Sequence, residues 1–406
     1  MKILVLNPGS STQKSCLYQL QDELPTTPPK PMWEGKIDWS GDDSGGKLEI
    51  ETDRTNKEIE LESRDELEAI AQMLDTLTQG DTKVINTLTE IDVVGHRVVH
   101  GGADYSQATR ITPEVKEAIA QLIPLAPEHN PAHLKGIEAI EAKLGDIPQV
   151  AVFDTAFHSQ MPLKAKVYPL PYKFYERGIR RYGFHGTSHR YCGHRAAQIL
   201  NKPLEELKII TCHLGNGCSL AAIANGVSID TTMGFTPLEG LMMGTRSGSI
   251  DPAILIYLMQ KEDYDRDRLN TLLNKESGLK GVSGISNDLR QIFKAIDENN
   301  ERAELAVDVY IHYLRKGIAA MAASLQGLDV LVFTAGVGEH QVLIREKACH
   351  GFEYMGLKLN KAKNKEEIME EDMAACDSKV RILTIPTNED WAIASECWQL
   401  FQQKRS

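Results

Sequence analysis

One short pattern occurs twice in this chain, at two places far apart in the sequence. Residues 2–14 align with residues 208–220, so that one apolar run meets another and Gly9 meets Gly215. In each copy a strand-like run reaches a turn of small residues, and a second apolar run follows. A hairpin of this kind presents backbone N–H groups to an anion without obstruction by side chains. The repeat predicts a duplicated domain with a cleft between the copies, although two common strand-turn-strand patterns could also coincide.

Strands and helices alternate through most of the remaining sequence. β-branched runs predict strands at residues 93–99, 150–153, 208–212, 330–334 and 380–385. Capping signals and apolar periodicity predict helices at residues 64–77, 112–123, 251–259 and 301–326. Residues 21–62 are rich in Pro, Gly and charge, and we expect a peripheral hairpin there. Over 406 residues, this alternation indicates an α/β protein of two or three domains.

The helix predicted at residues 64–77 illustrates the reasoning. Ser63 and Glu66 have the spacing of a capping box, and Gly80 follows as a stop signal. Its expected apolar stripe consists of Leu67, Ile70, Leu74 and Leu77.

Composition excludes several classes of partner. The chain has 45 Lys plus Arg against 57 Asp plus Glu, a net charge of −12, whereas a general nucleic-acid binder needs a basic surface. No apolar run approaches the roughly 18 residues of a membrane span, and the apolar run at the start is too short for a signal peptide. Seven cysteines without CxxC spacing fit thiols in a reducing compartment. We therefore expect a cytoplasmic protein with no membrane or nucleic-acid partner.

Three turns of small residues are candidates for binding phosphate. The first combines an amide, hydroxyls and an ammonium group on Asn7, Ser10, Ser11, Thr12 and Lys14. The second spans residues 213–217, and the third contains Gly336 and Gly338 directly after a predicted strand, with a helix expected to begin after it. No Walker A motif is present. Each turn taken alone is also compatible with an ordinary polar turn.

Two arginines and two carboxylates are the clearest candidates for charge chemistry. Arg97 and Arg246 lie among glycines and apolar or small residues, which favours inward side chains that bind carboxylate or phosphate. A structural ion pair is the alternative for each arginine. Asp154 and Glu389 follow predicted strands, where α/β proteins place metal and catalytic groups. Capping of a helix is the alternative for Glu389.

Histidines provide a competing hypothesis. Three pairs have i, i+4 spacing, namely His96/His100, His129/His133 and His185/His189. On helices such pairs could hold zinc, as in a zinc hydrolase. The HExxH motif is absent, and the first pair lies in a strand-like run. Hydrogen bonding in an active site and packing in the core are the alternatives.

Nine short motifs follow one another along the chain. They occupy residues 6–14, 95–102, 154–158, 182–189, 213–217, 233–240, 243–248, 334–339 and 386–389. Together they resemble the motifs of the acetate kinase family, and the resemblance extends from residue 1 to about residue 391. It implies a duplicated α/β fold of the actin-like ATPase (ribonuclease H-like) type, with two domains and a central cleft. The implied domains are residues 1–153 plus 388–406, for the acyl substrate and phosphoryl group, and residues 154–387, for the nucleotide.

The resemblance also implies an activity and a homodimer. The activity is reversible in-line phosphoryl transfer from ATP to acetate, which gives acetyl phosphate and ADP and requires Mg²⁺ or Mn²⁺ in its place. A propionate or butyrate kinase of the same family is the nearest alternative. A nucleotide-dependent assembly or chaperone protein is an alternative from another class.

Site residues are carried over from the family by motif. The implied catalytic residues are Arg97, Asp154, His185 and Arg246, with His185 and Arg246 stabilising the transition state. The implied substrate-binding residues are Arg97, Val99, Phe184 and Pro237, and the implied metal-binding residues are Asn7 and Glu389. The implied nucleotide-binding residues are Lys14, His213, Leu214, Gly215, Asn216, Gly217, Asp288, Leu289, Arg290, Gly336, Val337, Gly338 and Glu339.

The chain departs from the family pattern at three positions. Thr12 stands where serine is usual, which keeps the hydroxyl group. Glu128 stands where many relatives have leucine near the acyl pocket, so the polarity of that pocket is in question. Ser249 replaces a frequent aspartate, a change that we expect to be tolerated.

Overall fold

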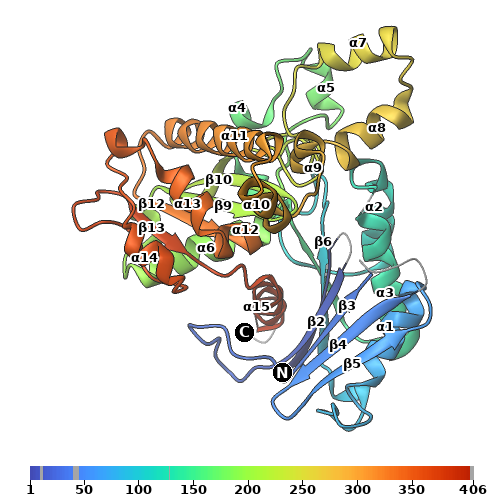
Figure 1. Ribbon diagram of the computed structural model, residues 1–406. Helices are drawn as coiled ribbons and strands as arrows, with labels where there is room; N and C mark the ends of the chain where they lie inside the picture. The colour runs from blue at the N-terminus through green and yellow to red at the C-terminus, as the bar shows by residue number, and fades with distance from the viewer. Residues whose placement is uncertain (10–11, 40–44, 128, 403–406) are drawn as a thin grey trace. The chain divides into compact units, whose positions relative to one another are not determined.

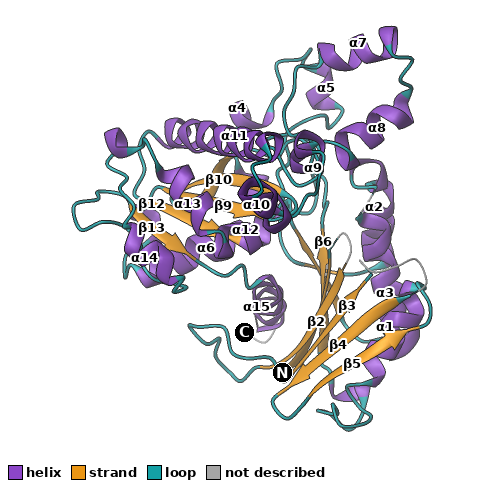
Figure 2. Ribbon diagram, in the orientation of Figure 1, coloured by secondary structure: helices purple, strands orange, loops and turns teal. Residues whose placement is uncertain are grey.

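The computed structural model describes residues 1–9, 12–39, 45–127 and 129–402 (Figure 1). The chain divides into two units. Unit 1 consists of Met1–Ala156 and Asn388–Ser406, and unit 2 consists of Phe157–Thr387. Each unit contains one mixed β-sheet with helices against it (Figure 2). No helix in the described ranges has both the length and the apolar character needed to cross a membrane.

Unit 1 contains an eight-stranded sheet. Its strands are β1 (Lys2–Pro8), β2 (Thr12–Gln19), β3 (Trp33–Asp38), β4 (Gly46–Thr52), β5 (Asn56–Leu61), β6 (Val93–Val98), β7 (Thr109–Arg110) and β8 (Gln149–Phe153). Their order is β5-β4-β3-β2-β1-β6-β8-β7. β1 pairs with β6, and β6 with β8, in parallel, whereas the other neighbours are antiparallel. The carboxyl ends of β1, β6 and β8 therefore meet at one edge of the sheet.

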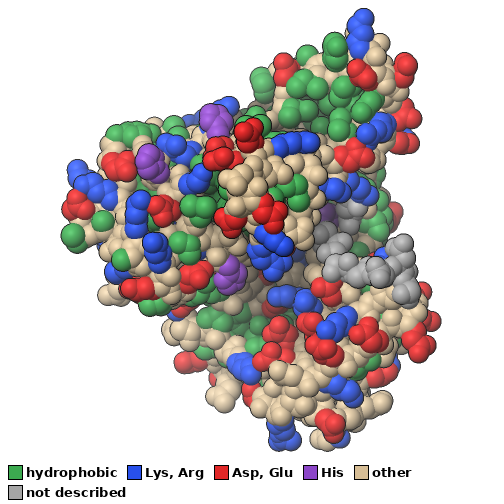
Figure 3. All heavy atoms as spheres, in the orientation of Figure 1, with side chains coloured by type: hydrophobic (Ala, Val, Ile, Leu, Met, Phe, Trp, Pro, Cys, Tyr) green, Lys and Arg blue, Asp and Glu red, His purple; other side chains and the backbone are tan. Residues whose placement is uncertain are grey.

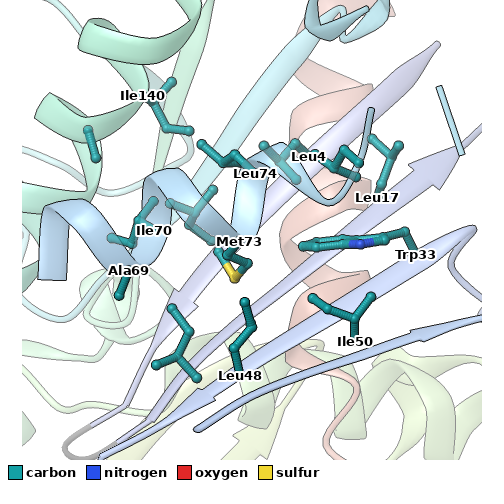
Figure 4. Close-up of a cluster of buried hydrophobic side chains, with 14 of the residues drawn as sticks. Leu4, Leu17, Trp33, Leu48, Ile50, Ala69, Ile70, Met73, Leu74 and Ile140 are labelled. Carbon is teal, nitrogen blue, oxygen red and sulfur yellow. The ribbon is translucent and has the colours of Figure 1, made fainter. Parts of the chain in front are cut away.

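Helices cover both faces of this sheet. They are α1 (Glu66–Asp75), α2 (Pro113–Gln121), α3 (Asn130–Leu144) and α15 (Glu389–Gln402), with short 3₁₀ turns at Leu88–Glu90 and Ile123–Leu125. On the face covered by α1 and α3, the indole of Trp33 is completely buried beside Met73, and Ile140 of α3 belongs to the same apolar cluster (Figure 4). Helix α15 packs against β1 and β6 on the other face (Figure 1). The carboxyl-terminal segment thus completes unit 1.

Two local predictions in unit 1 are wrong. Residues 21–62 do not form a peripheral hairpin, because β3, β4 and β5 extend the main sheet, and the alternate side chains of β3 and β4 enter the core. The N-cap of α1 is Asp65, which accepts hydrogen bonds from Leu67 and Glu68 N–H, rather than Ser63. Leu67 is 42% exposed, and Met73 takes its expected place in the buried stripe.

Unit 2 contains a five-stranded sheet. Its strands are β9 (Ile209–Leu214), β10 (Cys218–Ala224), β11 (Val227–Thr231), β12 (Val330–Thr334) and β13 (Arg381–Thr384). Their order is β11-β10-β9-β12-β13, and only the β9–β12 and β12–β13 pairs are parallel. Strands β3-β2-β1-β6-β8 of unit 1 have the same order and directions. The repeat between residues 2–14 and 208–220 therefore reflects a duplicated fold rather than coincidence.

The helices of unit 2 also lie on both faces of its sheet. They are α4 (Leu163–Lys166), α5 (Lys173–Glu176), α6 (Gly186–Ile199), α7 (Ala253–Lys261), α8 (Arg266–Lys275), α9 (Gly278–Ser283), α10 (Leu289–Asp297), α11 (Glu301–Leu325), α12 (Ala335–His340), α13 (Val342–Cys349) and α14 (Lys361–Glu366). Short 3₁₀ turns occupy Ala156–Gln160, Leu204–Glu206 and Glu353–Met355. Helix α6 packs against β9 and β12, and α11 lies on the opposite face (Figure 1). The helices predicted at residues 112–123, 251–259 and 301–326 are confirmed as α2, α7 and α11.

Candidate active site

A charged cluster lies at the carboxyl-terminal edge of the parallel strands of unit 1. We call it the Arg97 cluster, and its members are Asn7, Arg97, Asp154, Glu389 and Asp390. Arg97 on β6 donates from Nη2 to Asp154 Oδ2 at 2.8 Å and from Nε to both Asp154 oxygens at 3.2 Å. Its Nη1 lies 3.4 Å from Asn7 Oδ1 and 3.7 Å from Glu389 Oε2. Asn7 donates to Asp390 Oδ1 at 2.9 Å and lies 3.4 Å from Glu389 Oε2.

Burial makes the electrostatics of this cluster strong. Asp154 is only 1% exposed, and it faces Arg97 through a forked ion pair. Burial lowers the pKa of the Arg97 guanidinium, but Asp154 and Glu389 offset that effect, and the pKa lies above its usual value. Burial raises the pKa of Asp390 above its usual value. The cluster therefore concentrates several carboxylates around one permanent cation.

Sequence reasoning did not include Asp390 in the site. The signal was its position directly after Glu389 at the start of α15, where its side chain reaches Asn7 of β1. Lys14, predicted to bind nucleotide, pairs with Asn7 across the β1–β2 hairpin and is exposed. Ser10, Ser11 and Glu128, which the sequence singled out, lie outside the described residues.

The donor atoms of this cluster fit a hard divalent cation. Asn7, Asp154 and Glu389 offer amide and carboxylate oxygens, which are the ligands that Mg²⁺ prefers. Among the described residues, no group of three or more His, Cys, Asp or Glu side chains is arranged to hold a metal. The two carboxylates of Asp154 and Glu389 are still enough for Mg²⁺, because that ion commonly uses only one or two protein carboxylates together with substrate phosphates.

The histidine pairs do not converge on a common point. His96 Nε2 lies 2.7 Å from Gln149 Oε1, and His189 lies between two hydroxyl groups. Burial lowers the pKa of His96 to about 4, and it lowers the pKa of His133 and His189 as well. Bonds to amide and hydroxyl groups account for the neutral rings of His96 and His189 without zinc. Both ring nitrogens of His133 are buried and have no hydrogen-bond partner among the described residues.

A second polar group lies in unit 2, around the turn between β9 and β10. His185 precedes α6 in a left-handed conformation with φ of 55°, and its ring stacks on that of His213 at 4.0 Å. A Cβ atom built on Gly217 would lie 3.5 Å from both His185 Nε2 and Arg246 Nη1. His185, Arg246 and the 213–217 turn are therefore brought together in one place.

A partly buried hydrogen-bond network supports the segment that precedes Arg246. Arg246 Nη1 donates to the carbonyl oxygen of Pro237 at 2.8 Å. Glu239, two residues further on, accepts from Arg181 Nη2 at 2.6 Å and from the hydroxyl of Tyr168. Phe235 N–H donates to the same hydroxyl at 2.8 Å. Sequence reasoning missed these anchors, since nothing in the local pattern links residues 58 to 71 positions apart.

The segments predicted to bind nucleotide also meet in unit 2. Asn216 Oδ1 accepts from Asn287 Nδ2 at 3.1 Å, which links the 213–217 turn to the segment that leads into Asp288. Asp288 caps α10 and forms an ion pair with Arg290, which lowers the pKa of the carboxyl group. The acyl-pocket candidates are divided between the units, with Val99 in unit 1 and Phe184 and Pro237 in unit 2. Val99 and Phe184 are buried.

The segment that contains Gly336 and Gly338 was predicted to be a turn, but it is helical. Helix α12 begins at Ala335, directly after β12, so Gly336 and Gly338 lie inside the helix. The prediction of an open loop before a helix is wrong, because Ala335 itself, with φ of 63°, makes the change of direction. Arg345, completely buried, donates to the carbonyl oxygens of Gly338 at 3.0 Å and Glu339 at 2.6 Å. This arginine fixes the end of α12 and was also missed from the sequence.

Comparisons with known proteins agree with this geometry. The model of the acetokinase family matches residues 2–395. An acetate kinase of Gloeothece citriformis is 62% identical over 405 residues, covering 100% of both chains, and one of Rippkaea orientalis is 63% identical over 398 residues, covering 98% of both.

Solved structures give the same result. The acetate kinase of Porphyromonas gingivalis has a TM-score of 0.89 and 43% identity, covering 98% of this chain and 99% of that one. A propionate kinase of Francisella tularensis has a TM-score of 0.87 and 36% identity, covering 97% and 98%. With the repeated strand order, these similarities confirm the predicted α/β duplicated fold. The chain belongs to the acetokinase family.

Proposed function

We propose that this chain transfers the γ-phosphoryl group of ATP reversibly to acetate, giving acetyl phosphate and ADP by direct in-line transfer. Relatives that are 62% and 63% identical over nearly the whole chain are named acetate kinases. The single observation that carries the proposal is the meeting of His185 and Arg246 beside Gly217. A guanidinium and an imidazole beside a glycine turn suit a phosphoryl group, whose charge spreads over three equatorial oxygens in the transition state.

The two units contribute different groups to this reaction. In unit 2, Arg246 and His185 stabilise the transferring phosphoryl group, and residues 213–217 contact the nucleotide phosphates. Asp288, Leu289, Arg290 and residues 336–339 hold the adenosine. In unit 1, Arg97 holds the acetate carboxylate through Nη1, whose contacts of 3.4 and 3.7 Å are longer than those on its other edge. Lys14 adds positive charge for the nucleotide phosphates.

Asn7, Glu389 and Asp154 would hold Mg²⁺, or Mn²⁺ in its place. Bound there, the ion would neutralise phosphate charge and orient the phosphates. Val99 of unit 1 and, in unit 2, Phe184 and Pro237 are the residues we propose as contacts of the methyl group of acetate. Asp154 has a second role, because its ion pair with Arg97 fixes the plane of the guanidinium that receives the carboxylate.

The protein acts as a homodimer in the cytoplasm. Helix α7 has no buried residue, yet it exposes Ile254, Ile256, Tyr257 and Met259 at 45–58% (Figures 1 and 3). A cluster of exposed apolar side chains favours a protein interface that buries it, and a second copy of this chain is the simplest partner. Seven cysteines present as thiols, of which only Cys376 is exposed, support a reducing compartment.

Steady-state assays with Mg²⁺-ATP and acetate, propionate or butyrate test the activity. We expect acyl phosphate to form fastest from acetate, and ATP to form from ADP and acetyl phosphate. An assembly or chaperone ATPase would form no ATP in the second reaction. A preference for propionate or butyrate would replace the acetate assignment with the longer-chain alternative.

Arg246→Ala tests the role of the cation. We expect turnover to fall by about 10³-fold, by comparison with the loss of an arginine finger. Arg266→Ala is a matched control, because the Arg266 side chain is 90% exposed and forms an ion pair with its sequence neighbour Asp267. Near-normal turnover in the Arg246 variant would show that this assignment is wrong.

A further inference from the structure

Four side chains of unit 2 form one continuous line of hydrogen bonds. Thr211 Oγ1 lies 2.7 Å from His189 Nδ1, and His189 Nε2 lies 2.8 Å from Ser219 Oγ. The same Ser219 oxygen lies 2.8 Å from His185 Nδ1. Thr211, His189 and Ser219 are completely buried, so water does not compete for these bonds. The line ends at His185, whose Nε2 lies close to Gly217, as does Arg246 Nη1.

The hydrogens of this line can be placed by counting donors and acceptors. Burial lowers the pKa of His189, so its ring is neutral and carries one N–H. In the described part of the chain, the Thr211 hydroxyl has no hydrogen-bond partner other than His189. If His189 donated from Nδ1, Thr211 would accept that bond, and its own buried hydrogen would have no acceptor.

The opposite direction satisfies every hydrogen. Thr211 donates to His189 Nδ1, His189 Nε2–H donates to Ser219, and the Ser219 hydroxyl donates to His185 Nδ1. A nitrogen that accepts a hydrogen bond in a neutral imidazole leaves the proton on the other nitrogen. His185 then carries its hydrogen on Nε2, the ring nitrogen close to Gly217.

We infer that Ser219 is a positioning residue that holds His185 as the neutral Nε2–H tautomer, with Thr211 and His189 orienting the Ser219 hydroxyl. An Nε2–H group donates to an oxygen of the phosphoryl group, whereas a bare Nε2 would repel it. The role of this tautomer in catalysis rests on the proposed phosphoryl transfer. The assignment of the tautomer rests only on the hydrogen bonds described above.

Nuclear magnetic resonance of the wild-type protein tests the tautomer directly. The protein is labelled with ¹⁵N and ¹³C in histidine only, and the His185 signals are assigned by their loss in His185→Asn. At pH 7.5 we expect the ¹⁵N shifts of His185 to show a protonated Nε2 and an unprotonated Nδ1. A protonated Nδ1, alone or together with Nε2, would overturn the inference.

Variants then test the role of the serine. Ser219→Ala should remove the tautomer preference and lower kcat about tenfold, with KM for ATP and acetate changed less than twofold, because the lost hydrogen bond acts through His185. Ser219→Thr keeps the hydroxyl and should restore both. Ser228→Ala is the matched control for the spectrum, because it removes a serine–histidine contact of the same 2.8 Å length from His158.

The outcomes separate this inference from the proposed function. Unchanged His185 signals and unchanged kcat in Ser219→Ala would contradict the role of Ser219. If the wild-type protein showed Nε2–H signals but formed no acyl phosphate, the tautomer of His185 would be confirmed and the proposed kinase activity would be refuted.

Discussion

The two units share a strand order and differ in what they place at the same point of it. Asn7 of β1 aligns with His213 of β9, and both precede the turn of a β-hairpin. Around Asn7 the structure gathers one arginine and three carboxylates, whereas around His213 it gathers histidines and hydroxyl groups, with Arg246 close to the same turn. A duplicated fold therefore fixes where side chains meet, and substitution decides what chemistry each copy performs.

The difference extends to how each unit stabilises its polar groups. The Arg97 cluster balances buried charges against one another, so the removal of one member leaves another unpaired. In unit 2, burial lowers the pKa values of His158 and His189, and both rings bond to hydroxyl groups, so acid must force a proton onto a buried neutral ring. Four predictions test this contrast, in order of decreasing expected effect.

Acid should destabilise both units through buried neutral histidines. Burial lowers the pKa of His96 in unit 1 and of His158 in unit 2 to about 4, from an ordinary value of 6.5. Between these values the unfolded state binds more protons, so the free energy of unfolding falls as the pH drops. Each ring contributes on the order of 3 kcal/mol, so the two rings together should exceed the effect of any single substitution below. Urea denaturation at a series of pH values from 7 to 4 measures the slope.

The four tryptophans allow the units to be followed separately. Trp33, Trp39, Trp391 and Trp398 all lie in unit 1, so tryptophan fluorescence reports that unit, and circular dichroism reports the whole chain. We expect His96→Asn to flatten the slope seen by fluorescence. A slope unchanged in that variant would assign the acid sensitivity to other groups.

The two arginines should separate stability from activity. Arg97→Ala leaves Asp154 buried without its forked partner, and we expect the free energy of unfolding to fall by about 3–5 kcal/mol. Arg246→Ala should leave the fluorescence transition of unit 1 where it is in the wild type. Arg97→Lys keeps the charge, and a midpoint between those of the wild type and Arg97→Ala is expected. Equal urea midpoints for the two alanine variants would contradict the contrast.

Asp390→Asn should have the opposite sign. Because burial raises the pKa of Asp390, the folded state favours the protonated carboxyl, and stability falls as the pH rises through that pKa. An amide in its place removes this penalty, and we expect a gain of about 0.5–2 kcal/mol at pH 7.5. Asp53→Asn is the control, because that side chain is 74% exposed. Loss of stability in Asp390→Asn would show that the charge is needed.

Matched ion pairs on the surface of the two units should contribute least to the free energy of unfolding. In unit 1, Lys135 lies 3.2 Å from Glu66, and in unit 2, Lys347 lies 3.1 Å from Asp308. Both pairs link neighbouring helices and are partly exposed, so we expect each double-mutant cycle to give less than about 1 kcal/mol. A larger coupling energy in either unit would show that its ion pair is not the weak, solvent-screened contact expected here.

How far sequence could predict this structure depended on whether the signal was local. The strands at residues 93–99, 208–212 and 330–334 were predictable, because strands buried on both faces read as continuous apolar runs. Strands β3 to β5 carry alternating charges between turn residues, and that pattern fits a hairpin as well as a sheet extension. The cap of α1 was ambiguous, since Ser63 and Asp65 are both good acceptors near its start.

The site divides in the same way. Motifs identified the residues, but their contacts depend on the tertiary fold, as in the forked pair between Arg97 and Asp154, which are 57 positions apart. Neither the line from Thr211 to His185 nor the Tyr168–Glu239 contact has a signal within one motif. The assigned roles of these residues stay predictions that kinetics must decide.

Helix α15 has a consequence for the order of events during synthesis. Residues 389–402 pack against β1 and β6, and Gly95 of β6 closely approaches Ile393 and Cys397 of that helix. The unit that begins first on the ribosome is therefore the last to receive all its parts, whereas unit 2 is one uninterrupted segment. Unit 2 can fold while the apolar face of β1 and β6 is still uncovered by α15. In a truncated chain that lacks α15, we therefore expect this face to bind chaperones or to misassemble.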